Sequence, residues 1–194
     1  FATFGGFGVQ LLWCLLGLCG AFLFYSGNML WVASREKQGG RGLWFLIRAT
    51  PGICLGLCLA LSMTFVATPL LMNAGVQSVP LLEKGVFYLG WGGSLILALF
   101  GPPARSVLQL LRATALVTAL VPVSHGWATG AFVWTKLVEG RWQEAGVDLG
   151  ALCHAAGFAW LARLTRRRIE AAPRGSLWAL TADAESVQTS PESP

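Results

Sequence analysis

Long apolar runs alternate with short polar loops along most of this sequence. The first run, residues 9–32, has no charged residue over 24 positions. About 20 apolar residues, each rising 1.5 Å along a helix, cover the roughly 30 Å hydrocarbon core of a bilayer. Backbone polar groups in lipid must be hydrogen-bonded within their own segment, so such a run is predicted to be a helix. The repeated pattern predicts an all-α protein, a polytopic membrane helical bundle of about five transmembrane helices.

The five expected spans are joined by segments with turn or interface composition. The spans cover residues of about 9–32, 50–72, 85–101, 107–124 and 147–164. The last joining segment, residues 125–147, is rich in Trp, as is typical of a membrane interface. From residue 171 the sequence is rich in Pro, Ser and Glu, a composition that favours disorder. We therefore expect a transmembrane domain over residues 1–170, followed by a disordered cytoplasmic tail over residues 171–194.

The basic residues divide unequally between the two sides that five spans would create. One side holds Lys84, Lys136 and Arg141. The other side holds eleven, namely Arg35, Lys37, Arg41, Arg48, Arg105, Arg112, Arg163, Arg166, Arg167, Arg168 and Arg174. The positive-inside rule assigns the side with eleven to the cytoplasm. The N-terminus is then expected outside and the C-terminus inside.

The composition agrees with a membrane protein and argues against a soluble one. The chain is 55% hydrophobic and 12% charged, whereas soluble domains are about 25% charged. A soluble helical bundle would also need a polar face on each helix, and these runs lack one. The net charge of +5 arises from basic residues that flank the spans, where they can meet anionic headgroups. The expected partner is therefore the lipid bilayer, and nucleic acid is not expected.

The two histidines are the candidate functional residues. His125 ends the fourth expected span, and His154 lies about seven residues into the fifth, about 10 Å deep, in the outer half of the bilayer. An ionisable residue inside a membrane is a functional candidate by default. Two neutral imidazoles on different helices of a bundle could be ligands of a haem iron. The alternative, which the sequence leaves open, is an interfacial role for His125 and a hydrogen-bonded packing role for His154.

Other kinds of chemistry have no motif in this sequence. A P-loop, a zinc motif, an acidic pair within a span and a Ser/His/Asp set are all absent. The apparent lack of intramembrane carboxylates and of inverted repeats argues against a proton-coupled transporter. A small-molecule permease would need a polar pathway through the bundle, and few polar side chains could form one.

Three stretches of the sequence resemble a known family. They are FGGFGVQLLWCLLGLCGAFLFYSGNMLWV at residues 4–32, FYLGWGGSLILALFGP at residues 87–102 and GRWQEAGVDLGAL at residues 140–152. Together they resemble the C-terminal membrane part of PepSY-associated transmembrane proteins, over about residues 1–170. The segment SGNMLW at residues 26–31 is the most specific part of this resemblance.

The resemblance implies a location and a function. Members of the family are multi-pass proteins of the bacterial inner membrane, with further spans and a periplasmic PepSY region upstream. Some are similar to siderophore-iron reductases that contain haem b. The chain is then expected to be the C-terminal part of a haem-containing reductase that passes electrons from an unknown donor to periplasmic ferric-siderophores. His154 and His125 are its candidate haem ligands and hence its candidate metal ligands. The alternative is a non-enzymatic membrane anchor or interaction module for the PepSY region.

Overall fold

The computed structural model describes residues 12, 16, 23, 27 and 41–171, and these residues form helices joined by short turns, without strands. Its helices are α2 (Arg41–Asn73), α3 (Val79–Phe100), α4 (Pro103–Thr129), α5 (Val133–Val138) and α6 (Trp142–Glu170). The expected span at 9–32, except for four isolated helical positions, and the expected tail at 172–194 lie outside the described residues. The chain divides into two compact units, Phe1–Ile47 and Arg48–Pro194, and the following description concerns the second unit.

The expected all-α fold class is confirmed for the described residues. Three of their helical segments are long and apolar enough to cross a membrane: Phe45–Asn73, Pro103–Thr129 and Trp142–Glu170. These segments indicate a membrane protein. The 22-residue helix α3 is not among the three, so the count of five spans stays a prediction.

The helices extend beyond the expected spans. Helix α3 begins at Val79, inside the expected loop at 73–84, and Pro80 lies in its first turn. A proline there costs no hydrogen bond, because the first N–H groups of a helix have no intrahelical partner. Helix α6 covers Trp142–Glu170, whereas the expected span covered 147–164. Hydropathy identifies the apolar centre of a helix, whereas caps and turns determine where the helix ends. The expected spans are therefore shorter than the helices.

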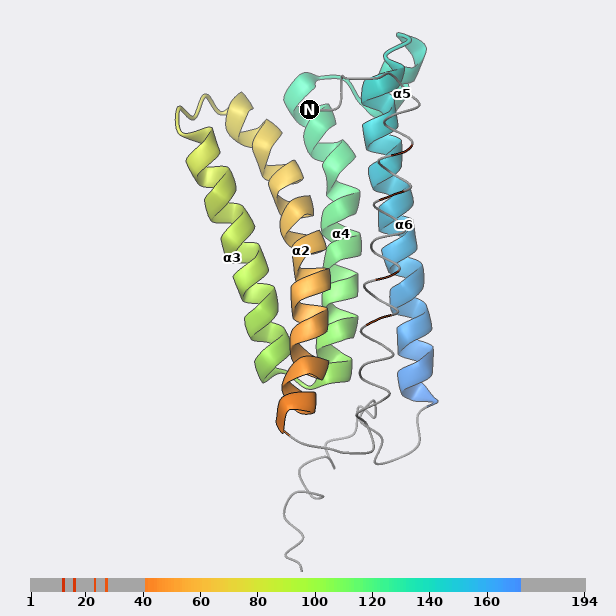
Figure 1. Ribbon diagram of the computed structural model, residues 1–194. Coiled ribbons are helices and arrows are strands. Elements are labelled where there is room, and N and C mark those ends of the chain that lie inside the picture. The colour runs from red at the N-terminus through yellow and green to blue at the C-terminus, as the bar shows by residue number, and fades with distance from the viewer. Residues whose placement is uncertain (1–11, 13–15, 17–22, 24–26, 28–40, 172–194) are drawn as a thin grey trace, which may run out of the picture. The chain divides into compact units, whose positions relative to one another are not determined.

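Helices α4 and α6 pack along a seam of mostly small residues (Figure 1). Four of the five buried residues of α6 recur at seven-residue steps, namely Asp148, Ala155, Ala162 and Ile169, and the fifth is Ala145. A seven-residue repeat keeps one face of a helix against a neighbour over many turns. Ala162 and Ile169 join Ala104, Leu108 and Leu111 of α4 in one apolar cluster. The rest of α6 is left largely exposed, as expected for a helix that meets lipid.

Helices α2 and α3 approach each other through glycines. A Cβ atom added at Gly52 would lie 2.7 Å from Cβ of Ala98, and one added at Gly56 would lie 2.7 Å from Cβ of Ser94. The Gly52-x-x-x-Gly56 spacing therefore forms a contact surface, as small residues do between helices in membranes. Arg48 of α2 donates from Nη1 to the carbonyl oxygen of Leu99, 2.9 Å away in the last turn of α3. The prediction from the sequence was that Arg48, as a basic residue flanking a span, contacts lipid headgroups.

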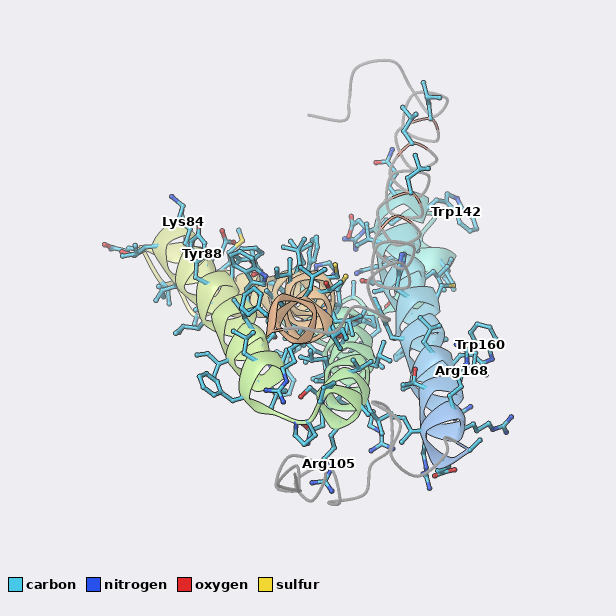
Figure 2. The ribbon with its side chains drawn as sticks, turned by 60° about the horizontal axis from the view of Figure 1, so that its bottom comes forward. Lys84, Tyr88, Arg105, Trp142, Trp160 and Arg168 are labelled. Atoms are coloured by element: carbon cyan, nitrogen blue, oxygen red, sulfur yellow. The ribbon has the colours of Figure 1, made fainter. Side chains whose placement is uncertain are left out.

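The charged residues of the second unit gather towards opposite ends of its helices. In Figure 2, Arg105 lies near the start of α4 and Arg168 near the end of α6, whereas Lys84 lies near the start of α3. Because these helices alternate in direction, the start of α4 and the ends of α3 and α6 lie at one end of the second unit (Figure 1). Which end faces the cytoplasm stays a prediction.

Candidate functional site

The end of α4, the short helix α5 and the start of α6 form one corner of the second unit. Helix α4 continues five residues past the expected end at 124 and stops at Thr129. Gly130 follows with φ of 70°, the left-handed conformation that commonly ends a helix and that glycine adopts without strain. Gly140, with φ of 72°, provides a second such turn between α5 and α6. These two turns fold the expected interfacial segment at 125–147 back against α6.

A cluster of three ionisable side chains joins α4, α5 and α6 in this corner. Asp148 of α6 lies at its centre, with Oδ1 2.8 Å from Nδ1 of His125 and Oδ2 2.7 Å from Nζ of Lys136. The side chains of Asp148 and Lys136 are 0% and 2% exposed. The His125 side chain is 27% exposed, so it is the member of the cluster nearest to the surroundings. We call these three residues the Asp148 cluster.

The charges of the Asp148 cluster explain how it can be buried. An isolated ion costs several kcal/mol to bury, and a buried charge is normally paired and hydrogen-bonded. Here each carboxylate oxygen has its own partner, and the charge of Lys136 balances that of Asp148. The three residues come from three helices. The cluster therefore joins the three helices at this corner through contacts among its own members.

The sequence reasoning missed two members of this cluster. The charge pattern identifies Lys136 only as a basic residue between spans. The predicted lack of carboxylates within the spans is wrong for α6. Asp148 lies inside the expected span at 147–164 and inside the membrane-length helix Trp142–Glu170. An aspartate in an otherwise apolar run was itself the signal that could have found the site, because intramembrane carboxylates are rare and usually paired.

The contact with Asp148 determines which nitrogen of His125 carries the proton. An ionised carboxylate only accepts hydrogen bonds, so Nδ1 of His125 must donate. A neutral imidazole with its proton on Nδ1 keeps its lone pair on Nε2. A carboxylate or carbonyl on one ring nitrogen is the usual partner of a histidine that binds a metal through the other. The geometry of His125 therefore suits both a structural role and a ligand role.

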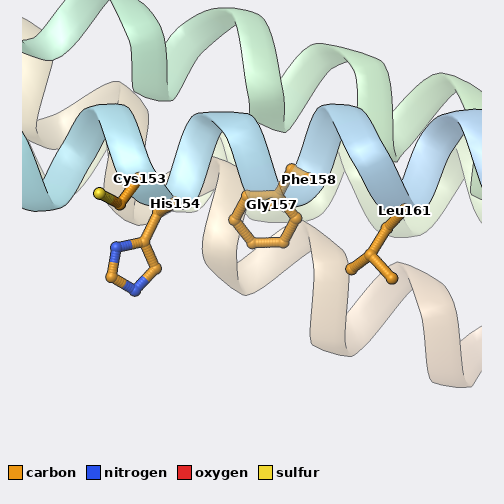
Figure 3. Close-up of a pocket in the computed structure, with 5 residues that line it drawn as sticks. All are labelled: Cys153, His154, Gly157, Phe158 and Leu161. Carbon is orange, nitrogen blue, oxygen red and sulfur yellow. The ribbon is translucent and has the colours of Figure 1, made fainter.

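His154 has different surroundings from His125. Its Nδ1 lies 2.7 Å from the carbonyl oxygen of Gly150 in the preceding turn of α6, and its side chain is exposed. A carbonyl oxygen only accepts, so Nδ1 again carries the proton and Nε2 the lone pair. His154 borders a shallow hollow of about 340 Å³ that is also lined by Cys153, Gly157, Phe158 and Leu161 (Figure 3). This hollow presents an imidazole, an aromatic ring and a position without a side chain on one helical surface.

The two imidazoles have different hydrogen-bonding partners and do not bond to each other. His154 follows Asp148 by six residues, which on an α-helix is about 9 Å along the axis and about 120° around it. His125 faces Asp148, so His154 points to another side of α6. Within residues 41–171, no group of three or more His, Cys, Asp or Glu side chains could together hold a metal ion. That result concerns sets of three ligands, whereas a haem iron takes at most two from the protein.

Comparisons of the chain with protein-family models, with curated proteins and with solved structures give no match. The resemblance to PepSY-associated transmembrane proteins is therefore untested by them.

Proposed function

We propose that this chain is the membrane part of a haem-dependent electron-transfer protein with about five spans. More specifically, we propose that the protein resides in the bacterial inner membrane and passes electrons to periplasmic ferric-siderophores. The observation that supports it best is the position of the imidazoles. Nδ1 of His154 and Nδ1 of His125 each lie within hydrogen-bond distance of an oxygen acceptor, and a neutral imidazole with its proton on Nδ1 offers the Nε2 lone pair to a metal.

The residues around His154 fit one side of a haem. Imidazole is a common axial ligand, and the bound group would supply one-electron chemistry. Gly157 leaves room for a flat macrocycle beside the imidazole, and the ring of Phe158 offers an apolar surface. The bond to Gly150 holds the His154 ring in a fixed orientation. The hollow is shallow, so the described residues could cover only one face of the macrocycle and the second face needs other residues.

His125 is the second proposed ligand, and it would work in a different setting. Asp148 fixes its ring orientation, and Lys136 keeps the carboxylate paired. Because His125 and His154 lie on different sides of α6, the arrangement favours a separate position for each over one haem held by both. The proposal therefore treats the two imidazoles as independent candidates.

Visible spectra of the purified, detergent-solubilised protein test this function. We would record oxidised and dithionite-reduced spectra of the wild type, His154→Ala, His125→Ala and a control, Leu152→Ala, which changes another exposed residue of α6. A haem signal that only the histidine variants lower or shift would support the proposal and assign the ligand. Absence of haem from the wild type after growth with ample iron and haem precursor would contradict it.

The second candidate is a non-enzymatic membrane anchor or interaction module for a periplasmic PepSY region. The Asp148 cluster favours it, because its charges are satisfied within the protein and give His125 a structural role. This candidate predicts a protein without cofactor in which His154→Ala leaves folding unchanged. The spectra above distinguish the two candidates.

A further inference from the structure

Helix α5 has its charged residue inside and two of its large apolar residues outside. Lys136 is 1% exposed, whereas Trp134 is 65% and Val138 is 89% exposed. Trp134 and Val138 are four residues apart and so share one face of the helix, and Lys136 lies on the opposite face. The Lys136 side chain reaches Asp148, so an ion pair holds this orientation.

The orientation is the reverse of that expected for a helix on a protein surface in water. There, apolar residues turn towards the core and charged residues towards the solvent. A short helix with Val and Trp outward would lose the hydrophobic stabilisation of both side chains if water surrounded it. The same helix is well placed if lipid surrounds it, because the apolar face then meets acyl chains and the charge meets its partner in the protein.

Neighbouring aromatic residues extend this apolar surface. Trp127 in the last turn of α4 and Trp142 at the start of α6 are both exposed. Phe132, just before α5, stacks on Trp134 with ring centroids 4.9 Å apart and planes 7° from parallel. Tryptophan is enriched where acyl chains meet headgroups. Three exposed Trp residues at one end of the bundle are therefore arranged as at the edge of a bilayer.

A band of exposed charges begins directly after α5. Arg141 lies in the turn between α5 and α6. It forms ion pairs with Glu139, just before it, and with Glu144, in the first turn of α6. The hydrogen bonds that Arg141 donates, first to Glu144 and then to Glu139, raise the pKa of its guanidinium. All three side chains are exposed and therefore need water or headgroups around them. The change from exposed apolar to exposed charged side chains occurs between Val138 and Glu139.

We propose that α5 is immersed in the bilayer at the boundary between acyl chains and headgroups. Trp134 and Val138 contact lipid, and the membrane surface passes at the level of Glu139–Arg141. The partner of this face is the lipid itself, because it explains the inward lysine, the outward apolar residues and the adjacent charges together. The Asp148 cluster then lies below the membrane surface, shielded from water by α5. The proposal needs a membrane protein but no haem.

Spin labels at single cysteines test the proposal in the full-length protein, reconstituted in phosphatidylethanolamine–phosphatidylglycerol vesicles. The five native cysteines are replaced by alanine, and labels are placed by Trp134→Cys and Val138→Cys, which leave the Asp148 cluster intact. Leu116→Cys, exposed midway along α4, is the lipid control, and Gln143→Cys, exposed in the charged band, is the aqueous control. Collision rates with oxygen report lipid contact, and rates with a water-soluble nickel chelate report water contact.

We expect labels at 134 and 138 to resemble the label at 116, with oxygen collisions at least several-fold more frequent relative to nickel than at 143. Nickel collisions as frequent as at 143 would overturn the proposal in favour of water. Protection from both reagents would overturn it in favour of a covering protein or a second copy of the chain. Quenching of the unlabelled protein by brominated lipids gives a second readout, because Trp134→Phe should then remove part of the quenched fluorescence.

Discussion

Helices α2 and α3 associate in a different way from helices α4, α5 and α6. The first pair is held by close backbone approach at glycines, with hydroxyl groups turned to nearby carbonyls, as when Ser94 donates to Gly90 at 2.7 Å. The second group adds a buried ion pair and a histidine to a seam of alanines. Glycine contacts need an exact shape and carry no charge. The Asp148 cluster needs three partners at once, and the loss of any one leaves an uncompensated group.

The difference teaches where this bundle should be sensitive. In lipid there is little hydrophobic driving force between helices, so packing and polar contacts decide which helices associate. A defect between α2 and α3 can be absorbed by a small shift of either helix. A defect in the Asp148 cluster leaves an unpaired charge buried inside the protein. The following variants should separate these two behaviours, and they are ordered from the largest expected effect to the smallest.

Asp148→Ala should have the largest effect. It leaves Lys136 buried without its carboxylate, and breaking a buried pair in this way typically costs about 3–5 kcal/mol. The free energy of unfolding in mixed micelles, titrated with a denaturing detergent, measures the loss. Leu149→Ala, the next residue on an exposed part of α6, is the matched control and should change little. In the double variant Lys136→Met/Asp148→Leu most of the stability should return. A double variant as unstable as Asp148→Ala would show that charge is not the cause.

Gly56→Val should have the next largest effect. The added Cβ would lie 2.7 Å from Cβ of Ser94, so α2 and α3 must separate, and such overpacking costs about 1–3 kcal/mol. Gly92→Ala is the control, because nothing lies within 4 Å of a Cβ at that position. It should be neutral or stabilising by up to about 1 kcal/mol, since alanine favours a helix. The same detergent titration compares them, and equal losses in both would refute the close contact.

Thr118→Val should have a small effect. It removes the 2.8 Å hydrogen bond between the hydroxyl groups of Ser62 in α2 and Thr118 in α4. Hydrogen bonds between membrane helices average about 0.6 kcal/mol. A double-mutant cycle with Ser62→Ala isolates this energy from the effect of each substitution alone. Strict additivity of the two single variants would mean that the two hydroxyls do not interact.

Glu144→Gln should leave the unfolding midpoint unchanged. Its ion pair with Arg141 is exposed, and exposed pairs contribute little. Because Glu144 raises the pKa of Arg141, any stabilisation is present below the pKa of the unfolded state and is lost only in strongly alkaline solution. Stability measured between pH 6 and pH 9 should thus show no dependence on this pair. A midpoint shift near that of Thr118→Val would contradict the assignment of these charges to the exposed surface.

Hydropathy predicts the helical class of this chain well but not the lengths of its helices. The run at 107–124 identifies α4, yet the helix continues through Gly126 to Thr129 and ends where Gly130 adopts the left-handed conformation. The short helix α5 has no sequence signal of its own. Its six residues are placed by the ion pair of Lys136 with Asp148, a contact between residues twelve apart.

The candidate site was predicted in part. The rarity of histidine in an apolar sequence was enough to select His125 and His154. Their partners could not be deduced, because the direction in which each side chain points depends on how α4 packs against α6. An average over many residues also treats Asp148 as a small reduction in hydropathy, although it is the residue on which the buried contacts of this corner converge.

The buried carboxylate also has a consequence for how the protein enters the membrane during synthesis. An aspartate at the centre of an isolated helix costs about 2.5–3.5 kcal/mol to insert through the translocon, and Asp148, six residues after the start of α6, should add a smaller cost of the same sign. Asp148 meets its two partners only when α4 and α5 lie beside α6. Released into lipid alone, α6 would carry an unpaired charge. We therefore expect the segment from Pro103 to Glu170 to leave the insertion machinery as one unit, with α4 waiting at the exit until α6 has been synthesised.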